Sequence, residues 1–508
     1  MFDWEGDGFL HLMAQCAKEK PDRVFATEFA HEGLITHRLA DILRRADRLA
    51  AGLAERGIGK GDRVACMMET HSDYICAVLA VARLGAIWVP VGTRLMPANL
   101  DYIFAEAGVQ LVLAETALAE VVAQAGHPDL AVIQRGEGGL DAVLGSDHPL
   151  PLVDVLPSDI LMISFTSGTT GRPKSVPVTH AMMRFSAEAA ARSSQSEPGA
   201  VLYVWEPFHH IGGAQLIVLP LIRDVTLALT QRFTASGFWD QVRACGATRI
   251  HHLGGILQML LKQPPSPRDR DHPVTVAWGG GCTADVWAAF SERFGVRMVE
   301  GYGMTEASSL TTINDEGLPG YVGRALPWFD VRILDPEGHE VPRGTRGEIV
   351  VAPIGKGAAA LFTGYLNSES ATRETLRNGR LHTGDQGEMD ADGRVRFHGR
   401  LKDTIRVRGE NVSAWEVEHV VEQHSAVAAC AVIPVKAEIG EADIKLFIQL
   451  APGIDANGAE IFDWLRTRLA PHQLPRHIAF IPAFERTPSQ RIMKHTLDAT
   501  PAGDWIRT

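Results

Sequence analysis

Long hydrophobic runs, paired cysteines and an excess of positive charge are all missing from this chain. No hydrophobic stretch approaches the ~18 residues that a membrane span needs, and residues 1–5 are acidic, with no apolar signal segment. The six cysteines lie far apart and form no Cys-x-x-Cys pair, a pattern typical of reduced thiols in the cytoplasm. We therefore expect a cytoplasmic protein without integral membrane association.

Acidic residues outnumber basic ones, since 61 Asp and Glu stand against 49 Lys and Arg, for a net charge of −12. This balance argues against nucleic acid as a partner, and it means that an anionic ligand needs a local basic site. The 508 residues are enough for two or three domains, and the hydrophobic content of 45% is ordinary for a globular protein.

Helical and strand patterns alternate from about residue 35 to 310. Apolar residues at helical spacing predict a helix over 39–53 that Gly57 ends, then a strand over 62–68. A helix capped by Ser72 and a strand over 86–90 follow. Further strands are expected at 201–204, 225–229, 274–278 and 296–299. This rhythm predicts an α/β fold with mainly parallel sheets, in which ligand loops gather at the carboxyl ends of strands.

The pattern changes after about residue 320. Hairpin turns at 335–338 and 390–393 join short strands and predict a small β-rich subdomain over ~320–399. The remaining chain predicts a small α+β domain, with a capping box at Ser413 and Glu416. Its strands are expected at 404–407, 429–435, 445–450 and 477–481, and its second helix at 459–469. We thus expect a large N-terminal domain, residues 1–399, and a C-terminal domain, residues 404–508.

A strand over residues 160–165 is followed by a loop built for phosphates. The loop is rich in hydroxyls and glycines and ends on a lysine: Thr166, Ser167, Gly168, Thr169, Thr170, Gly171, Arg172, Pro173, Lys174. It is not a Walker loop, because Pro173 stands where that pattern has Gly, and Phe165 excludes a nucleophile elbow. A flexible surface loop is the alternative interpretation.

Two more loops after strands carry candidate nucleotide contacts. Residues 300–306 contain an aromatic ring that can stack on a base, Tyr302, a hydroxyl for a phosphate, Thr305, and a carboxylate for Mg²⁺, Glu306. Glu306 also replaces the third glycine of a dinucleotide fingerprint, which excludes a Rossmann site. Residues 279–282 hold three glycines, which let a flat ring lie against the backbone. Each loop alone is equally consistent with a simple turn.

Charged residues recur near the boundary of the last domain. Thr383-Gly384-Asp385 reads as a tight turn whose carboxylate suits a ribose diol, and a capping Asp is the alternative. Residues 399–403 and 406–411 form a charged cluster that a solvated linker would also explain.

These motifs, in this order, resemble those of the ANL superfamily of adenylate-forming enzymes. The superfamily comprises acyl- and aryl-CoA synthetases, peptide-synthetase adenylation domains and beetle luciferases, and the resemblance covers nearly the whole chain. Glu410-Asn411-Val412 and residues 416–418 resemble the CoA-ligase branch, and residues 325–330 resemble the carnitine/crotonobetaine-CoA ligase-like group.

The resemblance implies an ATP-dependent carboxylic acid–CoA ligase. Such an enzyme joins a carboxylate to AMP with release of pyrophosphate and then passes the acyl group to coenzyme A, with Mg²⁺ bound to the nucleotide. Two alternatives stay open: an acceptor other than CoA, such as a carrier protein, and a non-catalytic protein that binds adenylates or acyl groups. Dimers are common in such families, so a homodimer is one expectation.

By resemblance, residues 166–174 grip the β- and γ-phosphates, and Asp385 and Arg400 hold the ribose. Thr305 contacts the α-phosphate and Glu306 binds Mg²⁺. The adenine and AMP contacts are Gly279, Gly280, Gly281, Cys282, Glu300, Gly301, Tyr302, Gly303 and Met304.

Residues 207–213 match the family's acyl-pocket segment, whose usual histidine aligns with His210. The expected acyl pocket comprises Trp205, Phe208, His210, Ile211, Gly212, Gly254, Gly255, Trp278 and Met304, and ordinary core packing is the alternative. The two tryptophans favour a flat or cationic acid, with a carnitine-like acid as one candidate. His209 and His210 are not expected to bind a metal, because neighbours on a strand face opposite ways, and the same holds for residues 251–252.

By resemblance, residues 400–403 form a hinge, with Lys402 at its centre, about which the mobile C-terminal domain turns between the two half-reactions. Arg406, Arg408, Gly409, Glu410 and Asn411 would line the CoA tunnel. The chain departs from the family where a Gly-Lys pair normally places the catalytic lysine, because Gln490-Arg491 stands there. We expect Arg491 to be the adenylation cation, with Lys494 as the alternative.

Overall fold

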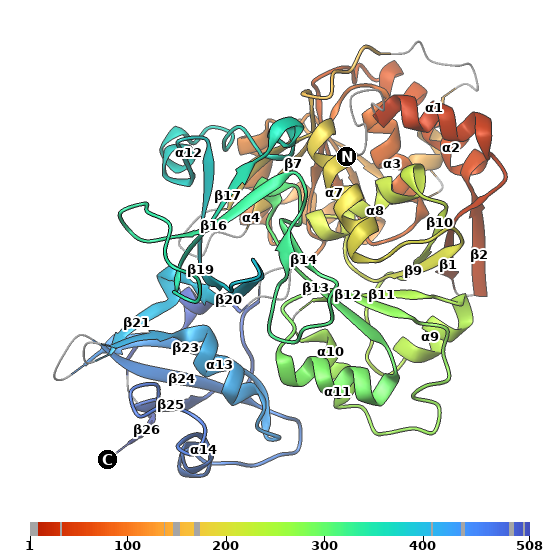
Figure 1. Cartoon of the computed structure of the whole chain (residues 1–508). Helices are drawn as coiled ribbons and strands as arrows, with labels where there is room; N and C mark the ends of the chain where they lie inside the picture. Colours follow the sequence, from red (N-terminus) through yellow and green to blue (C-terminus); the bar gives the residue numbers. More distant parts are fainter. Residues whose placement is uncertain are drawn as a thin grey trace. The chain divides into compact units, whose positions relative to one another are not determined.

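The computed structural model describes residues 9–30, 33–136, 138–145, 153–166, 173–253, 255–407, 410–437, 442–486, 492–500 and 503–507. Contacts divide the described chain into two units, and Figure 1 labels helices and strands of both. Unit 1 contains the described residues of 1–166, 173–331 and 351–381, and unit 2 those of 332–350 and 382–508. Each unit is described by itself below.

A six-stranded sheet in unit 1 carries the phosphate loop. Across the sheet its strands are β6 (Ala131–Gln134), β5 (Leu111–Ala114), β3 (Arg63–Met67), β4 (Ile87–Pro90), β7 (Ile160–Thr166) and β8 (Lys174–Thr179). The strands are parallel up to β7, and β8 runs antiparallel. Strands β3, β4 and β5 are almost wholly apolar and buried, as is typical of parallel strands in α/β sheets.

A nine-stranded sheet, also in unit 1, carries the other loops. Its order is β15 (Arg324–Ala325), β14 (Thr312–Asn314), β13 (Arg297–Tyr302), β12 (Val276–Gly280), β11 (Arg249–Leu253), β9 (Ala200–Val204), β10 (Val225–Leu229), β1 (Val24–Ala30) and β2 (Gly33–Arg38). The central pairings are parallel, and the edge strands β2, β14 and β15 are antiparallel. The predicted mixed α/β fold with mainly parallel sheets is confirmed.

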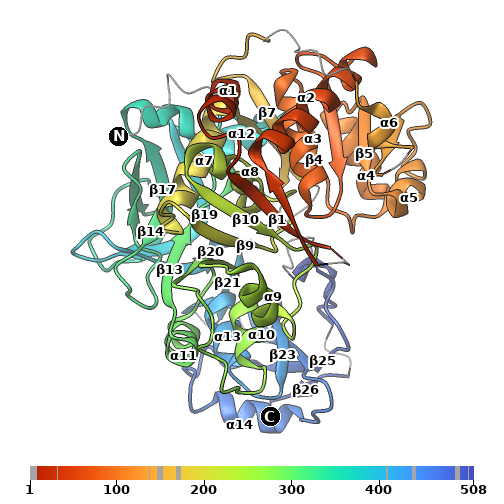
Figure 2. The ribbon, with the colours of Figure 1, turned by 90° about the vertical axis from the view of Figure 1, so that its right-hand side faces the viewer.

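The helices of unit 1 follow the predicted apolar spacing. In α2 (Leu39–Glu55) the residues at helical spacing are buried, and the helix packs on α3 (Ser72–Arg83), as Figure 2 shows. The predicted cap of α3 was wrong. His71 occupies the N-cap position, and its Nδ1 accepts the Tyr74 N–H at 3.2 Å, so an imidazole does what a hydroxyl was expected to do.

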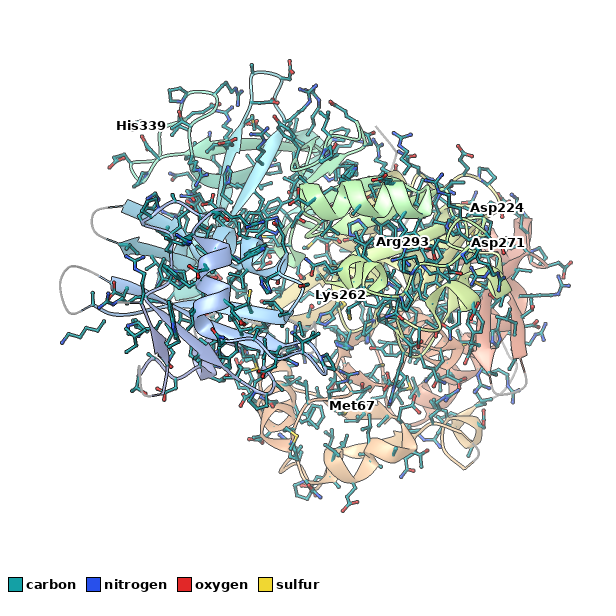
Figure 3. All side chains as sticks on the ribbon, turned by 90° about the horizontal axis from the view of Figure 1, so that it is seen from below. Met67, Asp224, Lys262, Asp271, Arg293 and His339 are labelled. Atoms are coloured by element: carbon teal, nitrogen blue, oxygen red, sulfur yellow. The ribbon has the colours of Figure 1, made fainter. Side chains whose placement is uncertain are left out.

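The other helices of unit 1 lie between strands, apart from the first one, which precedes β1. They are α1 (Phe9–Glu19), α4 (Pro97–Ala107), α5 (Ala119–Ala123), α6 (Leu140–Val143), α7 (His180–Ser193), α8 (Ile211–Ile222), α9 (Phe238–Cys245), α10 (Ile256–Leu261), α11 (Ala284–Phe294) and α12 (Glu369–Thr375). Arg293, labelled in Figure 3, ties the end of α11 to the segment before β12, since its guanidinium meets Asp269 at 2.8 Å and the Leu261 carbonyl at 2.7 Å.

Five strands form the predicted β-rich region. They are β16 (Phe329–Leu334), β17 (Gly347–Pro353), β19 (Arg380–Met389) and β18 (Leu376–Arg377) in sheet order, with β20 (Val395–Arg400) also paired to β19. Thr383-Gly384-Asp385 was predicted as a turn, and that was wrong, because these residues lie inside β19. Gly384 has a φ of +68°, so a local twist of the strand gave the sequence its turn-like character.

The end of the chain forms an α+β region in unit 2. Its sheet runs β23 (Val427–Lys436), β24 (Ala442–Leu450), β25 (His477–Phe480) and β26 (Trp505–Ile506), beside the hairpin β21 (Thr404–Val407) and β22 (Glu410–Ser413). Helix α13 (Ala414–Glu422) begins at the predicted cap, where the Ser413 hydroxyl accepts the Glu416 N–H at 3.4 Å. Helix α14 (Gly458–Leu465) ends four residues earlier than predicted.

In the described part of the chain, no helix combines the length and the apolar character that crossing a membrane requires.

Candidate active site

The two ends of the phosphate loop are fixed side by side. Thr166 ends β7 and Lys174 begins β8, and the two residues are paired in the antiparallel register. The Thr166 hydroxyl lies 3.4 Å from the Lys174 carbonyl. The loop residues between them, Ser167, Gly168, Thr169, Thr170 and Gly171, lie outside the described residues. The strands therefore present a hydroxyl and an ammonium at the place where the loop leaves the sheet.

Lys174 and Glu306 meet through a residue that the sequence reasoning missed. The Lys174 ammonium lies over the ring of Tyr365, 4.6 Å from its centroid. The Tyr365 hydroxyl donates a 2.8 Å hydrogen bond to Glu306 Oε1. A cation and a carboxylate are thus held on two sides of one aromatic ring, an arrangement suited to a ligand that carries both phosphate and a metal ion.

Glu306 and Thr305 are held in place by their backbone. Both residues lie in a short 3-10 turn directly after β13, and each is 8% exposed. The Glu306 carbonyl accepts the Phe362 N–H at 2.9 Å. The remaining carboxylate oxygen of Glu306 is a hard oxygen donor of the kind that Mg²⁺ prefers.

Glu300 joins the two loops predicted to bind adenine. Its side chain is 2% exposed, and its Oε1 accepts the Cys282 N–H at 2.9 Å. Burial raises the pKa of Glu300 to about 8, against the opposite effect of the Cys282 and Gly281 N–H groups. The carboxyl group is therefore largely neutral at pH 7, and its proton makes it a hydrogen-bond donor as well as an acceptor.

Gly279 is required by a close approach between strands. A Cβ atom at this position would collide with the backbone carbonyl of His252 on the neighbouring strand β11. Gly279 and Gly280 end β12, two residues later than the predicted strand, and Gly281 and Cys282 follow in a loop. Gly301 and Tyr302 end β13, and Gly303 and Met304 lead from it into the turn of Thr305.

The predicted acyl-pocket residues fall into two groups. Trp205 directly follows β9 and Trp278 lies inside β12, and both rings lie near that of His251 on β11, with centroids 6.2 and 4.3 Å away. Phe208 is instead part of the core, 1% exposed and edge-to-face on Tyr74 at 5.4 Å. His210, Ile211 and Gly212 begin α8, Gly255 begins α10, and Gly254 lies outside the described residues.

His209 and His210 were expected to face opposite ways along a strand, and that expectation was wrong. These residues lie in the turn before α8 rather than in a strand, and their rings are 4.3 Å apart instead of facing opposite ways. Burial lowers the pKa of His209 well below its usual value. Across the described residues, no cluster of three or more His, Cys, Asp or Glu side chains is arranged to hold a metal ion.

In unit 2 the predicted ribose residues form an ion pair. Asp385 and Arg400 are register partners on β19 and β20, and Arg400 Nε lies 2.8 Å from Asp385 Oδ1. Glu348 supports the same strand, since it accepts the Gly384 N–H at 3.0 Å and contacts His382 Nδ1 at 2.7 Å. The Asp385 carboxylate is thus fixed and 2% exposed.

Lys494, the alternative catalytic cation, is already engaged within unit 2. Its ammonium lies 2.9 Å from Glu418 and 3.5 Å from Asp403. Burial raises the pKa of Glu418 to about 7, with the Lys494 charge acting in the opposite direction. Lys402, next to Asp403, is exposed. Arg491 lies outside the described residues.

The residues predicted for CoA belong to the hairpin of β21 and β22. Arg406 pairs in register with Asn411, and Val407 with Glu410. Arg408 and Gly409 lie outside the described residues, and Arg406, Glu410 and Asn411 are described in their backbone alone.

Comparison with known proteins decides the family. The profile of the family described as AMP-binding enzyme matches residues 13–366, and that of its C-terminal domain matches residues 416–491. The chain belongs to the AMP-binding enzyme family. As an AMP-binding enzyme it is a member of the ANL superfamily, as the sequence motifs indicated.

Named relatives match this AMP-binding enzyme over most of its length. A feruloyl-CoA synthase from Amycolatopsis sp is 32% identical over 481 residues, covering 92% of this chain and 94% of the relative. A crotonobetaine/carnitine–CoA ligase from Salmonella paratyphi B is 30% identical over 481 residues, covering 90% and 92%. The crystal structure of ATP-bound MatB from Rhodopseudomonas palustris superposes with a TM-score of 0.84 at 26% identity, covering 95% and 97%.

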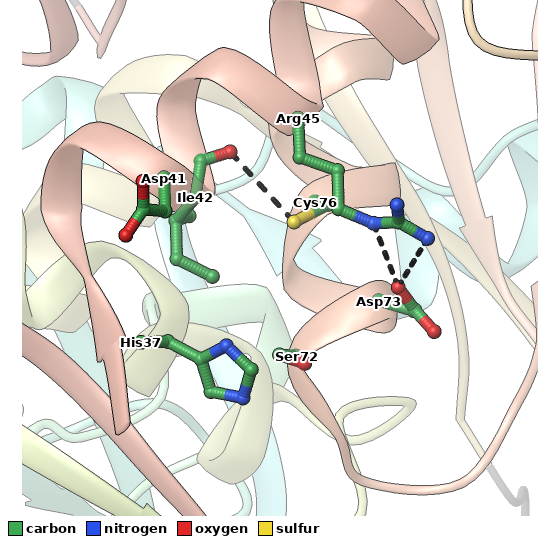
Figure 4. A pocket seen from close by; sticks show the side chains of 7 residues that line it. All are labelled: His37, Asp41, Ile42, Arg45, Ser72, Asp73 and Cys76. Atoms are coloured by element: carbon green, nitrogen blue, oxygen red, sulfur yellow. Dashed lines mark hydrogen bonds and ion pairs between the residues drawn. The ribbon is translucent and has the colours of Figure 1, made fainter. Parts of the chain in front are cut away.

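Two surface cavities of the AMP-binding enzyme contain none of the predicted site residues. One, of about 540 Å³, is lined by Ser370, Arg373, Glu374 and Arg377. The other, of about 260 Å³, includes Arg45 and Asp73 in its lining, and Figure 4 shows them paired with each other. Arg45 also contacts Asp141 at 2.7 Å, so its charge is satisfied by the protein itself.

Proposed function

We propose that the protein is an ATP-dependent carboxylic acid–CoA ligase that forms AMP. The observation that carries the proposal is the similarity, along nearly the whole chain, to relatives named as CoA synthases and ligases. The paired cation and carboxylate at Lys174 and Glu306 support it, because activation of an acid by ATP needs phosphate and metal charge balanced in one place.

The reaction has two steps. A carboxylate oxygen of the acid attacks the α-phosphorus of ATP, and the bond to the bridging oxygen of pyrophosphate breaks, leaving acyl-AMP. The CoA thiol then gives its proton to water, and the thiolate attacks the acyl carbon. The bond from that carbon to the phosphate oxygen breaks, and AMP leaves with its electron pair. The protein contributes mainly by orienting two anions that repel each other and by placing positive groups where charge develops.

The nucleotide site we propose combines the loops at the carboxyl ends of β7, β12 and β13. Lys174 and residues 166–171 would hold the β- and γ-phosphates, and Thr305 would donate to the α-phosphate. The glycines of residues 279–281 leave room for the adenine ring, with Tyr302 on its other side. Glu300 supports this site by fixing the Cys282 backbone.

The residues present fit a magnesium ion. Glu306 has one carboxylate oxygen bound to Tyr365 and a second oxygen to offer, and Mg²⁺ usually takes one or two carboxylates together with substrate phosphates and water. When bound, the ion would neutralise phosphate charge. Tyr365 would keep Glu306 in a fixed orientation toward it.

The ribose and CoA roles remain proposals about unit 2. The fixed carboxylate of Asp385 can accept hydrogen bonds from a diol, with Arg400 holding its orientation. The hairpin of β21 and β22 would contact CoA. We propose that the large domain spans residues 1–399 and the C-terminal domain residues 404–508. We propose Lys402 as the hinge between them, since its side chain is exposed and is not packed in a hydrophobic core.

Arg491 is our proposed adenylation cation. Lys494 would have to leave both Glu418 and Asp403 to reach a substrate, at the cost of a buried carboxylate without its partner. We therefore assign Lys494 a structural role, in which it stabilises the last segment of the chain through Glu418 and Asp403.

We also propose that the protein works in the cytoplasm and forms a homodimer. All six cysteines are free thiols, as a reducing compartment would keep them. Cell fractionation and light scattering of the purified protein test these two points.

The central test is pyrophosphate release from ATP with a broad panel of carboxylic acids, with and without CoA. We expect acid-dependent release of pyrophosphate and, with CoA, formation of the thioester and AMP. Pyrophosphate without any thioester would point to another acceptor, and no pyrophosphate with any acid would overturn the proposal.

A further inference from the structure

A buried carboxylate and imidazole lie beside two tryptophans of the expected acyl pocket, Trp205 and Trp278. Glu206 is 3% and His251 6% exposed, and Glu206 Oε2 lies 2.9 Å from His251 Nδ1. The geometry between these two atoms is not that of a hydrogen bond, and both are buried without another hydrogen-bond partner among the described residues. In the sequence, His251 was considered only as a metal ligand that was not expected to bind, and Glu206 was not considered; the nucleotide chemistry above uses neither.

The surrounding residues are arranged to accommodate this pair. His251 is the register partner of Trp278, so both side chains leave the same face of the sheet, and their rings are 4.3 Å apart. Trp205 donates its indole N–H to the His251 carbonyl at 2.8 Å, and this hydrogen bond fixes the Trp205 ring next to β11. Gly212 is needed because a Cβ atom there would collide with the Glu206 carboxylate.

The outer nitrogen of His251 is the atom that a ligand can use. No residue in the described chain hydrogen-bonds His251 Nε2. Unlike Nδ1, this atom is not wholly buried. An imidazole nitrogen accepts a hydrogen bond when it carries no proton and donates one when it does, so Nε2 can take either role toward a ligand.

We propose that Glu206 and His251 select a planar acid that carries a hydroxyl group at the end remote from its carboxylate. A hydroxyl both donates and accepts, so it suits Nε2 in either protonation state. The flanking rings of Trp205 and Trp278 favour a flat, aromatic body. This inference rests on the proposed function, because it assigns the substrate class of that same site.

The same geometry disfavours an acid with a quaternary ammonium group. Two tryptophans and a carboxylate would otherwise suit such a cation. Here the carboxylate lies against His251, whose ring is 4.3 Å from that of Trp278 and 6.2 Å from that of Trp205, so the carboxylate is not free to pair with a cation. An ammonium without N–H groups can donate nothing to Nε2, and a charged imidazole repels it.

The test compares pairs of acids that differ in one hydroxyl group: 4-hydroxycinnamate with cinnamate and 4-hydroxybenzoate with benzoate, with carnitine as the cationic acid. We expect kcat/KM of the wild type to be at least about tenfold higher for the hydroxylated member of the accepted pair, because its absence leaves a buried polar group unpaired. In His251→Phe this ratio should fall to within about twofold of one, mainly because kcat/KM for the hydroxylated acid decreases.

His272→Phe is the matched control. His272 also lies on a tryptophan, Trp239, at the same 4.3 Å between ring centroids, and it belongs to neither the nucleotide nor the acyl region. It should leave the ratio unchanged. If His251→Phe fails to fold because Glu206 is left unpaired, the double variant Glu206→Gln/His251→Phe removes the charge as well and is compared in its place.

The outcomes separate the two proposals. Equal kcat/KM for both members of each pair, an unchanged ratio in the variants, or a preference for carnitine would overturn the inference while leaving the ligase activity established. A wild-type protein that releases no pyrophosphate with any acid would overturn the proposed function, and the inference with it.

Discussion

The Tyr365 hydroxyl donates to Glu306 at 2.8 Å while the face of its ring lies under the Lys174 ammonium. One side chain thereby holds the proposed metal ligand and the proposed phosphate cation at fixed positions. Because Tyr365 is 59 residues after Glu306 in the chain, the folded structure alone brings these groups together.

Replacing Tyr365 by Phe separates the two contacts, since the ring remains and the hydroxyl is lost. A hydrogen bond to a charged group contributes about 1.5–3 kcal/mol, so we expect the Mg²⁺ concentration for half-maximal pyrophosphate release to rise roughly tenfold. A magnesium titration of that rate measures the effect. Tyr203→Phe, which loses a buried hydroxyl contact to Gln241 elsewhere in unit 1, is the control. An equal rise in both variants would contradict the role given to Tyr365.

Glu300 makes the stability of the protein depend on pH. Its folded-state pKa, about 8, is above the ordinary value of 4.5, so the folded protein holds a proton that the unfolded chain releases. The stabilisation is complete below pH 4.5 and is lost as the pH rises to about 8, at up to about 1.4 kcal/mol per pH unit. We expect the Tm of Glu300→Gln to decrease less than that of the wild type between pH 5 and pH 8. Identical pH profiles for wild type and variant would refute this account.

Lys494→Met should destabilise unit 2 through the carboxylate that it leaves behind. Without the lysine, Glu418 stays buried with no cation, its pKa rises further, and stability is lost as the pH rises. The expected loss is about 3 kcal/mol at pH 8 and smaller at pH 6, where Glu418 takes up a proton. Urea unfolding at both pH values measures it. Lys436→Met, at an exposed position of β23, should change little.

Arg491→Ala tests which cation serves adenylation. We expect the rate of acyl-AMP formation to fall by about 100-fold, as for removal of one group that stabilises developing charge, while a supplied acyl-AMP is still converted to the thioester. Pyrophosphate release and single-turnover thioester formation separate the steps. Arg486→Ala changes an exposed arginine five residues earlier and serves as the comparison. Loss of both half-reactions to the same degree would count against Arg491.

Local patterns predicted most of the fold, and contacts between distant residues account for what they missed. Strands β3, β4 and β7 and helix α2 were predicted within about two residues, because apolar spacing is a property of the segment itself. The strand expected at 274–278 instead forms β12 two residues later, where the glycines of the loop still fit against β11.

Residues of the proposed site could be named from the sequence where they form motifs, and could not be named where they do not. Thr305 and Glu306 follow a strand and could be found in the sequence. Tyr365 and the pair of Glu206 and His251 could not, since their partners lie 45 or more residues away and a lone Tyr or His in an apolar setting is usually a core residue. A polar residue next to a tryptophan at a strand end was the available signal for Glu206.

Lys402→Pro tests the proposed hinge. Proline fixes φ near −65°, so it should restrict the change in backbone direction that the second half-reaction requires. The residue is exposed and lies in a short turn, so folding should be little affected. We expect pyrophosphate release in the first turnover to stay within about twofold of wild type.

Conversion of acyl-AMP to the thioester should meanwhile slow by tenfold or more, as expected when a conformational step limits turnover. Lys402→Ala removes the charge and leaves the backbone free, so it should retain both rates. If the alanine variant slowed thioester formation as much as the proline variant, the ammonium group rather than backbone rotation would be responsible. If proline slowed both half-reactions alike, Lys402 would not be the point about which the domain turns.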